Sequence, residues 1–156
     1  MKAATINTIK AELQQLPTNR LIEVCIRLAR FKKDNKELLT FLLFESDDLE
    51  GYVVNVKLQA DVLFEEINTS NIYFCKKSIR KIGRVINRYI QYSGSKIVEV
   101  ELLLYFVTKI KESGIPIQKS TALNNLFNNQ LKKIKVAVSL LHEDLQYDYL
   151  KQMPVE

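Results

Sequence analysis

The residues of this sequence whose types and spacing best suggest chemistry are cations on one face of one helix. Residues 67–98 contain seven Lys or Arg and no Asp or Glu, whereas residues 36–66 contain two Lys and eight acids. At about 100° per residue, a helix ending near Tyr92 places six of these cations within an arc of about 140°. They are Lys76, Lys77, Arg80, Lys81, Arg84 and Arg88, with Tyr73 inside the arc and Tyr92 at its edge.

This basic face predicts binding to an anionic partner. Several cations on one rigid face can neutralise successive phosphates, and the neighbouring Tyr, Asn87 and Gln91 side chains add stacking and hydrogen bonds. An acidic protein surface would be recognised by the same charges. Because an acidic segment precedes the basic one, the two could also pair between copies in self-association. The sequence therefore predicts a protein-binding adaptor or a self-associating module, and as the alternative a nucleic-acid-binding protein.

A structural explanation of the same face stays open. The basic side could be only the solvated side of an amphipathic helix, or acids of the preceding helix could cover it, each exposed pair contributing about 0–1 kcal/mol. The acids in question are Asp61, Glu65, Glu66 and those at 45–50. A second basic cluster at 132–135 would strengthen the phosphate interpretation if it lay beside the first. The Asn-rich stretch 124–129 predicts an irregular helix start, or else a polar binding edge.

Catalytic chemistry is not predicted. The single histidine, His142, precedes Glu143 and Asp144, but adjacent helical residues point about 100° apart and do not converge on one ion. We expect His142 to be a surface residue near a helix end. The acids at 45–50 form no calcium loop and suit the start of a helix. An enzyme whose site is assembled across helices remains a distant third possibility.

The cysteines and the overall composition predict an ordinary domain without cofactor or metal. Cys25 and Cys75 lie fifty residues apart, outside any Cys-x-x-Cys pattern, so we expect two buried thiols. At 156 residues and 47% hydrophobic content, one domain over 1–156 is expected, with a tail that frays after about residue 150. The first residues lead into no apolar signal core and no run is long enough to span a membrane, which predicts a soluble, cytoplasmic protein.

Seven helices must position these groups, and few Gly or Pro interrupt them. We expect them at 6–16, from a cap at Thr18 to about 31, at 36–44, 47–67, 72–92 and 96–111, and from Ser120 or Thr121 to beyond Leu145. Segments 36–44 and 96–111 are apolar nearly all round, so both should be enclosed by protein. Helices of unequal length joined by short turns favour an irregular all-α bundle, with a short HEAT-like α-solenoid as the alternative.

Overall fold

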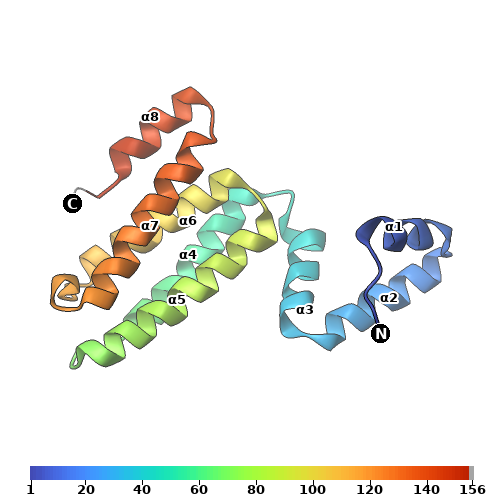
Figure 1. The fold of residues 1–156 in the computed structure, drawn as a ribbon, viewed down its shortest axis with the longest axis horizontal. Helices are drawn as coiled ribbons and strands as arrows, with labels where there is room; N and C mark the ends of the chain where they lie inside the picture. Colours follow the sequence, from blue (N-terminus) through green and yellow to red (C-terminus); the bar gives the residue numbers. More distant parts are fainter. Residues whose placement is uncertain (155–156) are drawn as a thin grey trace. The chain divides into compact units, whose positions relative to one another are not determined.

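The computed structural model describes residues 1–154 and confirms an all-α protein (Figure 1). The chain is 81% helical, with eight α-helices and no strand in the described part. The helices are α1 (Ile6–Gln15), α2 (Thr18–Phe31), α3 (Lys33–Thr40), α4 (Leu49–Glu65), α5 (Ile72–Ser93), α6 (Lys96–Glu112), α7 (Thr121–Ser139) and α8 (Glu143–Gln152). A π-helical turn (Phe41–Glu45) follows α3, and a 3-10 turn (Ile117–Lys119) precedes α7. None of the described helices combines the length and apolar character that crossing a membrane requires.

The helices form two compact units, which divide after Phe44. The first contains α1, α2 and α3, and the second contains all later helices. The prediction of one domain over 1–156 and the choice between a bundle and a solenoid both stay predictions. The part of the predicted frayed tail at 155 and 156 lies outside the described residues.

The first unit encloses almost none of its apolar side chains. Phe41 is its only buried residue among those described. The expectation that segment 36–44 is enclosed is wrong beyond Phe41, because the side chains of Leu42, Leu43 and Phe44 are 54–78% exposed. Cys25 is also exposed, against the prediction of a buried thiol. Three short helices supply too few side chains to surround a central one, since so small a unit buries little of its surface.

In the second unit, α6 is the central helix, as its apolar pattern predicts. Eight of its residues are buried: Val98, Val100, Leu102, Leu103, Leu104, Phe106, Val107 and Ile110. The helices α4, α5 and α7 all pack against α6. One core cluster joins Leu103 and Val107 of α6 to Ile134 and Val138 of α7. Neighbours therefore cover α6 on several sides, and its polar side chains are confined to one half-buried side that includes Glu101, Thr108 and Lys109.

The last predicted helix is two helices, which corrects the sequence analysis. Helix α7 ends at Ser139, and α8 begins at Glu143 after the break at 140–142. The His142 ring starts α8 by accepting a hydrogen bond from the backbone N–H of Asp144 over 3.4 Å. Side-chain acceptors at this position satisfy an otherwise unpaired helix N–H. Tyr149 and Met153 then pack back on the core cluster of α6 and α7.

Candidate functional site

The candidate site is a groove between α5 and α7, formed by two adjoining hollows. The first, of about 490 Å³, is lined by Tyr73, Lys76, Lys77, Arg80, Gly83, Arg84 and Asn87 of α5, Phe106 of α6, and Leu126 and Gln130 of α7. The second, of about 660 Å³, is lined by Arg80 and by Ala122, Asn125, Leu126, Asn129, Gln130 and Lys133 of α7. Arg80, Leu126 and Gln130 belong to both hollows, which therefore form one continuous feature, here called the α5–α7 groove.

Helix α5 places its cations in this groove because its two sides differ in polarity. Ile79, Ile82 and Ile86 are buried at three- and four-residue spacing and fix that side of α5 to the core. The cations at the intervening positions must then point away from the core. The helix starts at Asn71, whose side chain accepts from the N–H of Tyr73, and ends at Gly94, whose φ of 60° suits glycine. The predicted end of this helix near Tyr92 is confirmed, one residue later, at Ser93.

The groove floor depends on a close approach of α5 to α6. Gly83 lies on α5 beside the Phe106 ring, and a Cβ at Gly83 would stand 3.2 Å from Phe106 Cζ. Phe106 is itself buried. A side chain at position 83 would therefore push the two helices apart or displace the ring.

The charge of the groove is not neutralised within the described chain. Its lining contains five cations and no acid: Lys76, Lys77, Arg80, Arg84 and Lys133. Within residues 1–154 none of these five forms an ion pair, and the same holds for Lys81. The Lys76 ammonium lies over the Tyr73 ring at 5.5 Å from its centre, a cation–π contact that leaves the charge in place.

The acids that could have covered the basic face are engaged elsewhere or point to solvent. Asp61 of α4 pairs with Lys109 of α6, with 2.5 Å between Oδ1 and Nζ, and accepts from the Tyr105 hydroxyl. The hydrogen bond from Lys109 holds the pKa of Asp61 below its usual value. Asp48 caps its own helix by accepting from Gly51 N–H at 2.9 Å. Glu65 and Glu66 are exposed and form no ion pair in the described part of the chain.

Three residues of the predicted basic face lie outside the groove. Lys81 is exposed on α5 but lines neither hollow, and Arg88 and Tyr92 are half-buried further along the helix. The Tyr92 ring meets that of Tyr89 edge-on, with 5.9 Å between the centres. The structure thus brings Tyr73, Lys76, Lys77, Arg80 and Arg84 together.

Helix α7 contributes residues that the sequence analysis did not assign to the site. Residues 124–129 lie inside a regular helix, so the predicted irregular start is wrong, and Asn125 and Asn129 line the groove. Of the cluster at 132–135, Lys133 reaches the groove beside Arg80. The sequence analysis did not identify Gln130 as a residue of the site. The spacing of Leu126, Gln130 and Lys133 puts them on one helix face and could have indicated it.

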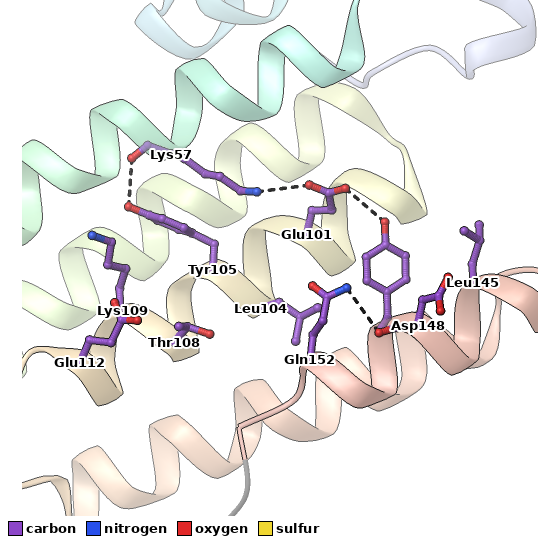
Figure 2. Close-up of a pocket in the computed structure, with 11 residues that line it drawn as sticks. Lys57, Glu101, Leu104, Tyr105, Thr108, Lys109, Glu112, Leu145, Asp148 and Gln152 are labelled. Atoms are coloured by element: carbon purple, nitrogen blue, oxygen red, sulfur yellow. Dashed lines mark hydrogen bonds and ion pairs between the residues drawn. The ribbon is translucent and has the colours of Figure 1, made fainter.

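A separate hollow, of about 580 Å³, lies between α4, α6 and α8, outside the α5–α7 groove (Figure 2). It is here called the α8 cavity. It is lined by Lys57, Glu101, Leu104, Tyr105, Thr108, Lys109, Glu112, Leu145, Asp148, Tyr149 and Gln152. Each of its two cations pairs with an acid, Lys57 with Glu101 and Lys109 with Asp61. Lys57 Nζ lies 3.2 Å from one oxygen of Glu101, and the Tyr149 hydroxyl donates to the other oxygen at 3.2 Å. Burial, together with the charge of Glu101, raises the pKa of Tyr149 to about 12.

The remaining candidate groups are isolated. His142 is exposed and stays at the start of α8, and its Nδ1 lies 3.4 Å from Asp144 Oδ2. Cys75 is buried, as predicted, and donates its S–H to the Asn68 carbonyl at 3.3 Å. The described residues contain no cluster of three or more His, Cys, Asp or Glu that could hold a metal ion.

Comparison of the chain with protein-family models, with curated proteins and with solved structures gives no match. The functional argument therefore rests on the geometry of the groove.

Proposed function

We propose that this chain is a non-enzymatic interaction module whose α5–α7 groove binds an anionic partner. The observation that carries the proposal is the absence of any acid from the lining, although the chain contains 18 Asp and Glu. Folding alone does not favour five like charges around one groove, because like charges repel. An anionic ligand would remove that repulsion on binding.

The supporting detail is that two helices contribute the charge. Lys76, Lys77, Arg80 and Arg84 come from α5, and Lys133 comes from α7. If the basic side of α5 were only its solvated side, we would expect cations on that helix alone, without a further cation on the opposite wall of the groove. Cations on both walls instead focus the potential in the groove and raise the rate of association with an anion.

The test is binding of two labelled polyanions, heparin and poly-glutamate, measured by fluorescence anisotropy. The wild type should bind at least one of them at low salt and lose affinity as salt screens the exposed charges. The double reversal Arg80→Glu/Arg84→Glu should lower the affinity at least about tenfold, since it replaces two attractions by two repulsions.

The matched control is Lys81→Glu/Lys135→Glu. It changes the net charge equally, and both side chains are exposed outside the groove lining. We expect it to lower the affinity less than about threefold. Equal losses in the two variants would show that net charge, and not the groove, determines binding. A wild type that binds neither polyanion at low salt would overturn the proposal.

A further inference from the structure

The floor of the groove holds an amide that a purely electrostatic surface does not need. Gln130 of α7 is 8% exposed and is the only buried polar side chain of the described residues. Its Oε1 has no hydrogen-bond partner within them, and the side chain lines both hollows of the groove. A buried acceptor without a donor is unfavourable for folding. A ligand that offers a donor would satisfy Oε1 once the amide turns this atom towards the hollow.

The chemistry of that ligand follows from the amide. A Gln side chain presents one acceptor and two donor hydrogens, and its terminal torsion is soft, so either end can turn towards the hollow. The carboxylates of an acidic protein accept hydrogen bonds and do not donate them, so they leave Oε1 unsatisfied. The edge of a nucleobase carries donors beside acceptors and pairs with both ends of an amide.

The cations around Gln130 are spaced for a chain of phosphates. Lys76, Arg80 and Arg84 follow one another at four-residue intervals, which corresponds to about 6 Å along the helix axis per step. Lys133 stands across the groove from this row and shares the second hollow with Arg80. A backbone running along α5 would therefore meet successive positive charges, while its bases point towards α7.

One end of the row carries an aromatic ring. Tyr73 lines the first hollow, and its side chain is 59% exposed. The Lys76 ammonium lies over the ring, and the Phe74 ring meets it edge-on, with 5.7 Å between the centres. An exposed ring beside a basic groove is the arrangement on which unpaired bases stack.

We propose that the anion bound in the α5–α7 groove is single-stranded nucleic acid. Its phosphates contact Lys76, Arg80, Arg84 and Lys133, one base hydrogen-bonds the Gln130 amide, and another stacks on Tyr73. The strand must be single because a paired base presents neither a free pairing edge to Gln130 nor an open face to Tyr73. This inference rests on the proposed function and adds to it the class of partner.

The experiment compares four labelled probes by fluorescence anisotropy. They are an oligonucleotide of about 12 nucleotides, an abasic strand of the same length and charge, a duplex of the same length, and poly-glutamate. We expect the oligonucleotide to bind about tenfold more tightly than the abasic strand, because only it offers bases to Gln130 and Tyr73. Its affinity should fall with salt at a logarithmic slope of up to about −2.8, as expected for four phosphate contacts to a single strand.

Two variants separate base recognition from charge. Gln130→Met keeps the length of the buried side chain and removes the amide, and Tyr73→Leu removes an exposed ring. Each should weaken binding of the oligonucleotide by about threefold, so that the two together account for the tenfold preference, and leave the abasic strand and the salt slope unchanged. Tyr73→Leu lies at an exposed position, so it tests the inference even if Gln130→Met disturbs packing.

The other outcomes overturn the inference in distinguishable ways. Equal binding of the oligonucleotide and the abasic strand, or tighter binding of the duplex, would show that the groove reads no bases of a single strand. Binding of poly-glutamate without binding of the oligonucleotide would retain the proposed function and replace the partner by an acidic protein. Binding of none of the four probes, and none of heparin, would remove both proposals.

Discussion

The α5–α7 groove and the α8 cavity are both built on α6, yet they use charge in opposite ways. In the α8 cavity, Lys57 meets Glu101 and the neighbouring Lys109 meets Asp61, so each cation is matched by an acid of another helix. In the groove the cations of α5 face Lys133 of α7, without any acid in the lining. Matched charges tie helices together, whereas unmatched charges of one sign are available to a ligand.

This difference separates the expected effects of substitution. Changes in the α8 cavity should alter the free energy of unfolding and leave binding unchanged. Changes of the groove cations should alter binding and leave stability nearly unchanged, because those side chains make no ion pair within residues 1–154 that could be lost.

The largest expected effect is on stability and comes from the floor of the α8 cavity. Leu104 is 5% exposed, lines the cavity and belongs to the core cluster of α6 and α7. Leu104→Ala should lower the free energy of unfolding by about 2–5 kcal/mol, measured by urea denaturation. Leu126→Ala at the half-buried groove wall is the control and should cost clearly less. Equal losses would mean that the groove wall is as much part of the core as the cavity floor.

A smaller loss is expected at the groove floor. Gly83→Ala brings a Cβ to 3.2 Å from Cζ of the buried Phe106 ring, so that the ring or the helix must shift by a few tenths of an ångström. Overpacking of this kind costs about 1–3 kcal/mol, and the higher helix propensity of Ala offsets about 1 kcal/mol. We expect a net loss of about 1 kcal/mol in thermal or urea unfolding. In a double-mutant cycle, Phe106→Leu should relieve the contact, and strict additivity of the two changes would contradict this explanation.

A loss of similar or smaller size should follow when the ion pair of the α8 cavity is broken. Glu101→Gln removes the partner of Lys57 and weakens the bond from Tyr149, so we expect a loss of up to about 1 kcal/mol. The affinity for heparin should not change. The control Glu99→Gln breaks an i,i+3 pair with Lys96 within one helix and should cost less. A changed affinity in Glu101→Gln would break the proposed separation between the two regions.

Local patterns predicted the groove cations but could not predict the groove. The position of the cations on one side of α5 and the end of this helix near Tyr92 follow from neighbouring residues, and these predictions are confirmed. The place of Lys133 beside Arg80 depends on how α7 crosses α6, which no short segment encodes. The pairing of Asp61 with Lys109 joins positions 48 residues apart, and the α7–α8 break lies inside a continuing apolar pattern. Such features arise from packing that overrides the local preference.

The smallest expected effect concerns pH and Tyr149. Because the pKa of Tyr149 is raised to about 12 in the folded chain, its contribution to stability is complete below about pH 10, the usual Tyr value, and is lost as the pH rises towards 12. Tyr149→Phe should lower the free energy of unfolding at pH 8 by about 0.5 kcal/mol, since the side chain is only partly buried and solvent weakens the interaction with Glu101.

The free energies of unfolding of the wild type and of Tyr149→Phe should then converge as the pH rises from about 10 to 12. In that interval the wild type loses the stabilisation by the Tyr149 hydroxyl, which the variant already lacks. Urea denaturation at several alkaline pH values measures this. Tyr147→Phe is the matched control, since Tyr147 lies on the same helix with its side chain exposed. The free energy of unfolding of this variant should change with pH in parallel with that of the wild type. A constant gap between wild type and Tyr149→Phe across this range would show that the hydroxyl does not couple α8 to Glu101. The α8 cavity would then keep its two cation–acid pairs, which distinguish it from the groove, without a link from α8 to Glu101.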